Sequence, residues 1–519
     1  MKKKTLLSIF AAFLAGTIPS FAAVEFYVAT NGDDGNDGSK NSPFATVEQA
    51  ALSVNDNEET TIYLEKDATF KIGKIDFKEN KLVSIIGDNT TLLGADKPGN
   101  QGGEANRILR AGKKCTISVK GLNFRNSRQI EYLPGGAIFF IGDKLTVENC
   151  RFYDNECGSG GGAIGSRGNV VIVKNCYFEG NYTIGGGSYG GAIMQAGSAD
   201  ASYSSLYVEN CTFYKNALTV GGQGTAIATY DPSQNGGQYS TTSRLDVVNC
   251  TFVGNTSGYA YQAAVDITGG SECETHLINN TFYDNDGALR LYFQTVPVYM
   301  FNNFIYANKA GVLSEWSIAD SERTAITGYN NMIYGAERSV NEKIDDPCFQ
   351  GEAAACNNTL GLANDNPMVN LGVATSLKTN DGFMPYLPII NRNSPLIDAG
   401  LDDSSAYTET NEIPATDVRG ASKKDKKDIG AFEYGGDAGV ATNLASNDAI
   451  SFIQNAGNIV VASSDNEAIE VAVYTVDGKL ALTASGSTVD INKAELPKGL
   501  VIVKAAGKAG VATCKAIVK

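Results

Sequence analysis

The stretch Thr146-Val-Glu-Asn-Cys-Arg-Phe-Tyr-Asp-Asn155 decides the fold of this chain, because copies of it follow along the sequence. We call this stretch and its copies the repeated phrase. The clearest copies are Val173-Lys-Asn-Cys-Tyr-Phe-Glu-Gly-Asn181, Val208-Glu-Asn-Cys-Thr-Phe-Tyr-Lys-Asn216 and Val247-Val-Asn-Cys-Thr-Phe-Val-Gly-Asn255. Weaker copies are Leu277-Ile-Asn-Asn-Thr-Phe-Tyr-Asp-Asn285 and Met300-Phe-Asn-Asn-Phe-Ile-Tyr-Ala-Asn308. A second motif, Gly-Gly-Ala-Ile, alternates with the first at residues 135–138, 161–164 and 190–193, with looser forms at 224–227 and 287–289.

The spacing of these copies indicates a repeat architecture. Equivalent positions lie 23 to 39 residues apart, at Leu122, Cys150, Cys176, Cys211, Cys250, Asn280, Asn303 and Asn331. Such variable spacing excludes a heptad and a strict solenoid. It favours stacked coils whose strands stay constant while their loops vary in length.

Each copy predicts two short strands joined by a bend. In Val-x-Asn-Cys-x-Phe the apolar side chains need a common interior, and the Asn breaks the strict alternation of a strand. Asn tolerates the backbone of a bend, and its amide can bond to the Asn of the next coil. We therefore expect an Asn ladder made of Asn149, Asn175, Asn210, Asn249, Asn279, Asn302 and Asn330. The Gly-Gly-Ala-Ile motif supplies a tight turn and then the next strand.

The composition favours a sheet-rich exported protein. The chain has 519 residues with 57 Gly, only 13 Pro and 19% charged residues, and its formal net charge is −15. This acidic balance argues against nucleic acid as a partner, since phosphate binding needs a basic surface. It also gives a polyanionic substrate no long-range attraction.

The N-terminus predicts a secretory signal peptide. Residues 2–4 are lysines, residues 5–18 are apolar but too short to span a bilayer, and Ser20-Phe21-Ala22 is a small-x-small cleavage site. Cleavage after Ala22 removes three lysines and changes the net charge from −15 to −18. No later apolar run is long enough to cross a membrane, so we expect a secreted or outer cell-surface protein.

Pattern and composition divide the chain into four parts. We expect a signal peptide at residues 1–22, a β-helix with an N-terminal cap and an irregular C-terminal close at 23–435, a linker at 436–445 and a small β-sandwich at 446–519. In the cap, one face of a short helix would carry Phe44, Val47, Ala51 and Val54. In the sandwich, Asp477-Gly478 between alternating strands predicts a hairpin.

The cysteines and acidic residues predict no metal cofactor. Of the ten Cys, Cys348 and Cys356 are the best disulfide candidates, whereas the Cys of the repeated phrase favour a stack of small buried side chains. A zinc site is not expected, because the chain has no CxxC pair and only one His, His276. Carboxylates of the loop 31–38 could hold calcium, but their spacing does not match an EF-hand loop, which favours a solvated turn.

The coils resemble those of the pectin-lyase-like proteins, which are right-handed parallel β-helices. The strand Thr61-Ile-Tyr-Leu64 near the start carries this likeness, and the pairing of Gly-Gly-Ala-Ile with Phe-x-x-Asn is similar to the repeats of polymorphic outer-membrane adhesins. The resemblance implies an all-β fold, a single-stranded right-handed parallel β-helix followed by the small β-sandwich. It does not imply one chemistry, because this fold carries lyases, hydrolases and non-catalytic adhesins.

The two ends of the mature chain resemble further families. Tyr27-Val-Ala-Thr-Asn-Gly32, Ser394-Pro-Leu-Ile-Asp-Ala-Gly400 and Asp428-Ile-Gly-Ala-Phe-Glu433 are similar to secreted β-helix proteins of the choice-of-anchor class. Val473-Tyr-Thr-Val-Asp-Gly-Lys479 and Leu496-Pro-Lys-Gly-Leu-Val-Ile-Val503 resemble a C-terminal sorting domain of the type IX secretion system. This resemblance implies that the secretion machinery is a partner of the last domain.

Aligning the strands after the Gly-Gly-Ala-Ile turns yields candidate site residues. One outward column is Phe139, Gly165, Met194, Ala228, Asp266, Arg290 and Ser314. A second, two residues further on, is Ile141, Arg167, Ala196, Tyr230, Thr268, Tyr292 and Trp316. The first column makes Asp266 and Arg290 the candidate catalytic pair, and the second gathers Tyr230, Tyr292 and Trp316 for stacking on sugars. The simpler alternative is a surface ion pair of little energetic value, beside aromatic residues that cover strand edges.

Three functions remain open at this point. The first is a secreted or cell-surface β-helix protein that binds glycans or a surface partner without catalysis. The second is a polysaccharide lyase or glycosidase that acts in a groove on the β-helix, with Arg290 as its essential residue. The third is a purely structural role in a surface layer.

Overall fold

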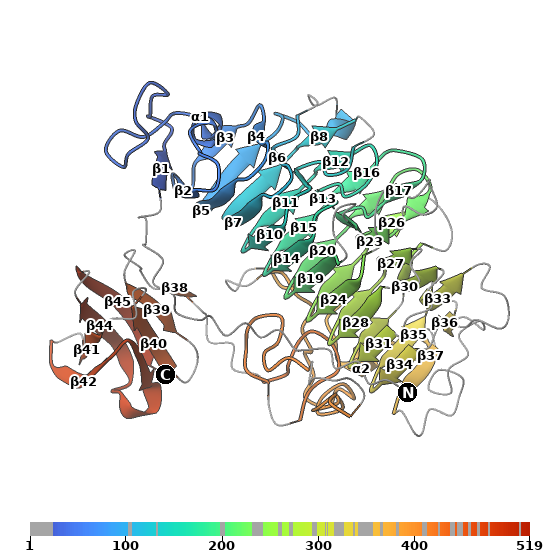
Figure 1. Cartoon of the computed structure of the whole chain (residues 1–519). Coiled ribbons are helices and arrows are strands. Elements are labelled where there is room, and N and C mark those ends of the chain that lie inside the picture. The colour runs from blue at the N-terminus through green and yellow to red at the C-terminus, as the bar shows by residue number, and fades with distance from the viewer. Residues whose placement is uncertain are drawn as a thin grey trace, which may run out of the picture.

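The computed structural model describes the chain as a parallel β-helix followed by an antiparallel β-sandwich (Figure 1). It describes residues 24–518 except 102–105, 131–132, 198–202, 231–241, 258–261, 269–272, 293–297, 307, 309, 316–325, 336–337, 341–356, 364–366, 380–383, 407–412, 424–425, 436–441, 444–449, 455–457, 464–467, 476–477 and 508–509. The predicted signal peptide and both disulfide candidates, Cys348 and Cys356, lie outside the described residues.

Each coil of the β-helix contributes to three rows of parallel strands. The first row is β1 (Val24–Val28), β2 (Glu59–Leu64), β5 (Leu82–Leu93), β7 (Thr116–Arg125), β10 (Lys144–Glu148), β14 (Val170–Lys174), β19 (Ser205–Glu209), β24 (Arg244–Val248), β28 (Glu274–Ile278), β31 (Val298–Phe301) and β34 (Ile326–Tyr329). The second row is β3 (Thr69–Lys71), the later parts of β5 and β7, β11 (Arg151–Tyr153), β15 (Tyr177–Glu179), β20 (Thr212–Tyr214), β25 (Thr251–Val253), β29 (Thr281–Tyr283), β32 (Phe304–Tyr306), β35 (Met332–Gly335) and β37 (Thr359–Leu362).

The third row follows the Gly-Gly-Ala-Ile turns. It consists of β4 (Ile75–Phe77), β6 (Leu109–Ala111), β9 (Ile138–Phe140), β13 (Ile164–Ser166), β18 (Ile193–Ala196), β23 (Ile227–Tyr230), β27 (Val265–Thr268), β30 (Gly287–Tyr292), β33 (Ala310–Glu315) and β36 (Arg338–Val340). Two short sheets lie between the second and third rows in chain order, β8 (Arg128–Gln129), β12 (Glu156–Cys157), β16 (Tyr182–Thr183), β21 (Ala217–Leu218) and β26 (Thr256–Ser257), then β17 (Ser188–Tyr189) and β22 (Gly222–Gln223). The first Gly of each turn has a positive φ, 80° at Gly135 and 66° at Gly161, which explains the preference for Gly there.

The repeated phrase builds the interior as predicted. The Phe of successive phrases stack face to face with ring centroids 4.6 to 4.8 Å apart, from Phe124 to Phe282. The Cys of the phrases, Cys150 to Cys250, are fully buried and unpaired, as small apolar residues of the core. Because the coils stack in register, each coil covers apolar side chains of its neighbours that a single coil would leave exposed.

Two asparagine positions perform different tasks. The predicted bend between the first and second rows is present, because Asn149, Asn175 and their equivalents have φ between 52° and 56°. Their amides bond from coil to coil only in part, for example from Asn210 to Asn175 at 3.2 Å. The continuous ladder is formed instead by the last Asn of each phrase, whose buried side chains are joined by bonds of 2.8 to 3.0 Å, at Asn155, Asn181, Asn216, Asn255, Asn285 and Asn308.

The N-terminal cap contains the predicted helix, α1 (Val47–Leu52), which begins at Thr46 with a side-chain cap. Val47 and Ala50 are buried against the first coils, so the helix covers the start of the core. In the preceding acidic loop, Asp34 accepts hydrogen bonds of 2.9 Å from the backbone of Ala45 and Thr46. This carboxylate therefore stabilises the turn that leads into α1.

The C-terminal close, residues 367–435, includes the short helix α2 (Met368–Leu371) and packs along the β-helix at the bend between the first and second rows (Figure 1, orange). Amides of the bend asparagines donate to its backbone, from Asn249 to Thr416 at 2.7 Å and from Asn330 to Ala399 at 2.8 Å. The motifs Ser394–Gly400 and Asp428–Glu433 contact each other, because the backbone N–H of Asp398 donates to Asp428 Oδ1 at 2.9 Å.

The C-terminal domain is a sandwich of two antiparallel sheets. One sheet is β38 (Thr442–Asn443), β39 (Ile450–Gln454), β40 (Asn458–Ser463) and β43 (Thr488–Asn492), and the other is β42 (Leu480–Gly486), β41 (Ile469–Thr475), β44 (Gly499–Gly507) and β45 (Gly510–Val518). Residues of both sheets share one apolar core. The predicted hairpin joins β41 to β42. Two residues of the predicted linker, Thr442 and Asn443, pair with β39.

Candidate functional site

The third row places the predicted pair Asp266 and Arg290 together but buries it. The two residues are register partners on β27 and β30, and Arg290 Nε lies 2.7 Å from Asp266 Oδ2. Asp266 is 0% and Arg290 4% exposed, so the expectation of an outward, accessible column is wrong. The same column is buried at Phe139, Met194 and Ala228. The pair itself is therefore not accessible to a ligand.

The predicted alignment of the aromatic column is wrong at its last step. Tyr230 packs against Tyr189, with ring centroids 4.4 Å apart. Tyr292 has Thr268 and Glu315 as its register partners, so the alignment that put Trp316 beside it is wrong by one residue. Trp316 itself lies outside the described residues. A shift of one residue moves every side chain of a strand to the other face.

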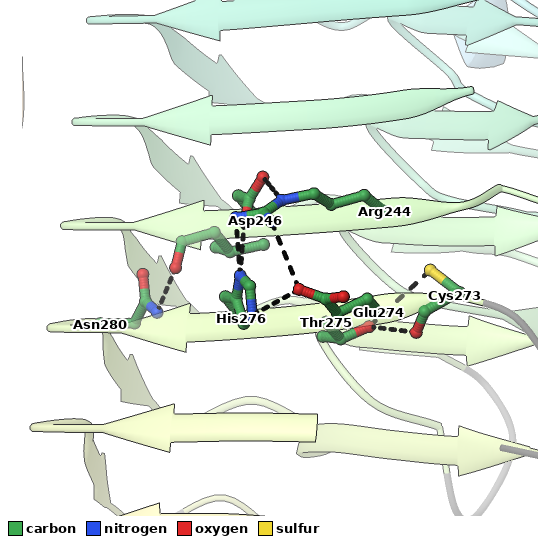
Figure 2. Close-up of polar contacts among 8 residues, drawn as sticks. Arg244, Asp246, Cys273, Glu274, Thr275, His276 and Asn280 are labelled. Atoms are coloured by element: carbon green, nitrogen blue, oxygen red, sulfur yellow. Dashed lines mark hydrogen bonds and ion pairs between the residues drawn. The ribbon is translucent and has the colours of Figure 1, made fainter. Parts of the chain in front are cut away.

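A different polar cluster lies on the outward face of the first row (Figure 2). It consists of Arg244 and Asp246 on β24 and of Glu274 and His276 on β28. The strands are parallel and in register, with Arg244 opposite Glu274 and Asp246 opposite His276. The intervening residues, such as Leu245 and Leu277, are buried in the core, so alternation turns all four polar side chains outward.

Arg244 is the hub of this cluster, which we call the first-row cluster. Its Nε donates to both carboxylate oxygens of Asp246, at 3.0 and 2.8 Å. Its Nη1 lies 3.3 Å from Glu274 Oε1, and its Nη2 lies 2.9 Å from His276 Nδ1. The guanidinium thereby bridges two coils, and all three of its nitrogens contact the cluster.

His276 lies between the two carboxylates. Its Nδ1 is 2.9 Å from Asp246 Oδ1, and its Nε2 is 3.1 Å from Glu274 Oε1. An imidazole with a proton on each nitrogen can donate to both carboxylates at once, whereas a bare Nδ1 would accept from Arg244 instead. In either form the buried ring, 1% exposed, fixes the carboxylates on both sides of it.

The contacts of the cluster lower the pKa of both carboxyls. Burial alone would raise the pKa of Asp246, but hydrogen bonds from His276 and Arg244 outweigh it, and the pKa is lowered. The hydrogen bond from His276 is the largest cause of the lowered pKa of Glu274, and burial opposes it. Both side chains are therefore ionised at neutral pH.

Tyrosines surround the cluster on the neighbouring coils. Tyr207 on β19 is the register partner of Asp246, and Tyr299 on β31 is that of His276, with the Tyr299 ring 4.9 Å from the imidazole. Tyr203, just before β19, is 50% exposed. Burial raises the pKa of the Tyr203 hydroxyl, and the charges of Arg244 and Asp246 act on it in opposite directions. The exposed parts of the site are thus Tyr203, Arg244 and Glu274.

Sequence reasoning missed this cluster although the signal was present. Asp246 lies four residues before Cys250, and the same offset from Cys211, Asn280 and Asn303 yields Tyr207, His276 and Tyr299. The register of the repeated phrase therefore predicts this column without any ambiguity of alignment. The predicted site residues lie on the strands after the Gly-Gly-Ala-Ile turns instead, and His276 entered the sequence-based expectations only as a zinc ligand.

Metal binding and membrane spanning were two further possibilities for the described residues. No group of three or more His, Cys, Asp or Glu side chains among them could hold a metal ion. None of the helices in this part of the chain has the length and apolar character needed to cross a membrane.

Comparison with known proteins supports the fold. A family model described as right handed beta helix region matches residues 108–331, which include both strands of the first-row cluster. No curated protein sequence matches the chain.

Solved structures similar to this chain include three proteins whose names indicate that they act on or bind sugars. They are a complex of XylC with xylose (12% identity, 79% of this chain and 98% of that chain, TM-score 0.41), pectate lyase Pel9A (16%, 80% and 97%, 0.34) and the GH136 lacto-N-biosidase from Eubacterium ramulus (11%, 62% and 66%, 0.29). Identities and TM-scores this low give no information about the chemistry of the first-row cluster.

Proposed function

We propose that this protein binds glycans on the outward face of the first row, without turning them over. The observation that carries the proposal is the first-row cluster, in which buried His276 and Asp246 hold half-exposed Glu274 and Arg244 in fixed positions. Tyr203 is half-exposed and close enough for the charges of Arg244, Asp246 and Glu274 to act on its hydroxyl. An isolated surface ion pair would lack such support.

The chemistry of the exposed groups suits a saccharide. Tyrosine presents an apolar ring face and a polar hydroxyl, which match the C–H face and the hydroxyls of a pyranose. Ionised Glu274 accepts strong hydrogen bonds from sugar hydroxyls, and Arg244 donates them. Because the supporting residues are already in place, less conformational entropy is lost on binding.

The same geometry favours binding over turnover. A glycosidase needs one carboxyl that stays protonated as the general acid. The pKa values of Asp246 and Glu274 are both lowered, so neither supplies that proton at neutral pH. The earlier catalytic candidate, Arg290, is buried against Asp266 and out of reach of a polymer.

We further propose that the protein acts outside the cell. The signal-like N-terminus and the resemblance of the last domain to a type IX sorting domain support export through that machinery. The adhesin-like repeats are compatible with a surface-exposed β-helix.

A glycan array followed by affinity electrophoresis of the full chain tests the binding proposal. We expect retardation by at least one polysaccharide, and at least about tenfold weaker binding for Arg244→Ala. The matched control is Lys144→Ala, a charged residue in the same outward column that lies outside the cluster. Equal binding by both variants, or release of shortened or unsaturated products by the wild-type protein, would contradict the proposal.

A further inference from the structure

We infer that the first-row cluster selects neutral, hydroxyl-rich saccharides and discriminates against uronates and other acidic sugars. This inference rests on the proposed function, since it names the substrate class of the same site. It follows from which charges of the cluster are already engaged and which are offered to a ligand.

The positive charge of the cluster is engaged. Arg244 faces Asp246 through Nε and Glu274 through Nη1, so that two carboxylates share one guanidinium. Recognition of a sugar carboxylate relies on a guanidinium fork that is open to form paired hydrogen bonds. Here Nε and Nη1 already face carboxylates of the protein itself, and Nη2 faces His276 Nδ1.

The group offered to a ligand is an anion. The side chain of Glu274 is 45% exposed, against 10% for Asp246 and 1% for His276. Its contacts with Arg244 and His276 both reach Oε1, and among the described residues none is made by Oε2 (Figure 2). A carboxylate oxygen accepts hydrogen bonds and donates none, so Oε2 suits a hydroxyl and repels a second carboxylate.

Among the described residues of the neighbouring strands, no other cation takes up this role. On β14, Lys174 lies 2.8 Å from Glu209 and 5.0 Å from the Tyr207 ring, so it is engaged by its own neighbours. The next outward positions of β24 and β28 are Val248 and Ile278, which pack against Ile413 of the close. A uronate placed at the cluster would therefore face ionised Glu274 without a compensating charge.

The charge of the whole chain acts in the same direction. Its formal net charge is −15, which repels polyanions at a distance and weakens their encounter with the surface at low salt. Neutral polysaccharides feel no such repulsion. Long-range and local electrostatics therefore select the same class of ligand.

The test compares matched neutral and acidic ligands on the full chain. Calorimetry would use neutral oligosaccharides, such as those of xylan, mannan and cellulose, against oligogalacturonates and alginate oligomers of equal length. We expect neutral binding and at least about tenfold weaker uronate binding, because like charges in contact disfavour a complex.

Glu274→Gln sharpens the test, because it keeps the shape of the side chain and removes its charge. We expect this variant to bind neutral ligands more weakly and uronates more strongly than the wild type, a crossed effect that a merely structural role would not produce. Glu148→Gln on β10, another outward Glu of the first row, should change neither. His276 is the only histidine, so its single imidazole NMR signal reports whether the ligand binds at the cluster.

The possible results separate the two proposals. Preferential uronate binding that weakens in Glu274→Gln overturns the substrate class and leaves glycan binding standing. If neutral saccharides bind without changing the His276 NMR signal, and Glu274→Gln binds them as tightly as the wild type, then the ligand does not bind at the first-row cluster. That result overturns both the proposed binding site and its selectivity. No binding to any saccharide overturns the proposed function and this inference together.

Discussion

The first and third rows of the β-helix each bring opposite charges together on adjacent coils, but in different surroundings. In the third row Asp266 and Arg290 form a pair whose side chains are 0% and 5% exposed. In the first row Arg244 and Glu274 remain 32% and 45% exposed, above buried Asp246 and His276. The same pairing of residue types therefore contributes to stability in one row and is available to a ligand in the other.

The comparison teaches that accessibility, not residue type, separates a structural pair from a site. A buried ion pair has lost its hydration, so that removing one partner leaves an uncompensated charge. A half-exposed pair keeps part of its hydration, so its removal changes stability little and recognition more.

The largest expected effect is in the third row. Arg290→Met removes the guanidinium from buried Asp266 and should lower the free energy of unfolding by about 3–5 kcal/mol. Chemical denaturation followed by circular dichroism measures this loss. The double variant Asp266→Leu/Arg290→Met should recover most of it, since a buried pair can be replaced by apolar residues. A double variant no more stable than the single one would contradict this account.

A third charged group, in the C-terminal close, extends the contrast. Burial lowers the pKa of Lys423 from 10.5 to about 7, with Glu433 and Asp417 opposing the shift. The folded state therefore binds this proton less tightly than the unfolded state, and stability should rise with pH between about 7 and 10.5. The slope can reach about 1.4 kcal/mol per pH unit.

Lys423→Met should flatten this alkaline rise while the close stays docked, because Met keeps the length of the apolar stem. Unfolding measured at pH values across this window, for both proteins, checks the prediction. The same alkaline slope in Lys423→Met would assign the effect to another group.

Tyrosine substitutions compare the two rows as binding faces. Tyr203→Ala, beside the first-row cluster, should weaken glycan binding by about two- to tenfold, because an aromatic contact is worth about 0.5–1.5 kcal/mol. Tyr230→Ala, on the third row, should leave affinity unchanged. Affinity electrophoresis of both variants decides between the rows. Loss of binding only in Tyr230→Ala would move the site back to the third row.

The smallest expected effect is an acid-dependent loss of stability from the first-row cluster. Asp246 and Glu274 have pKa values below their ordinary 3.8 and 4.5. Their contribution is present above those unfolded-state values and is lost as pH falls through the lower folded values. In Glu274→Gln, which removes the charge of the more exposed carboxylate, the acid side of the stability profile should shift by less than about 1 kcal/mol. An unchanged profile would mean that these contacts contribute nothing to folding.

Much of the fold was predictable because its signal is local and repeated. The Phe of each phrase had to meet the Phe of the next coil, and the rings do stack, as Phe152 on Phe178 at 4.8 Å. The bend at Asn149 followed from a broken alternation, and its φ of 53° confirms it. The antiparallel β-sandwich was predictable from the alternating strands of the last domain, and its hairpin joins β41 to β42.

The site was less predictable, for two physical reasons. The Gly-Gly-Ala-Ile strands looked half-exposed, yet Asp266 is buried, and alternation alone does not tell an outer face from a covered one. No Gly-Gly-Ala-Ile motif precedes β33 to fix its alignment, and Tyr292 pairs with Glu315 instead of the expected Trp316. The first-row column, by contrast, keeps a constant offset from the repeated phrase.

The sequence by itself determined the coils, the register of the first and second rows and the residues that fill the interior, because a repeat states the same local preference many times. Only the tertiary structure decided which outward column is open and which is covered. It placed His276 between Asp246 and Glu274, residues 30 and two positions away in the chain. Exposure depends on how distant segments pack, and no local pattern of residue types records it.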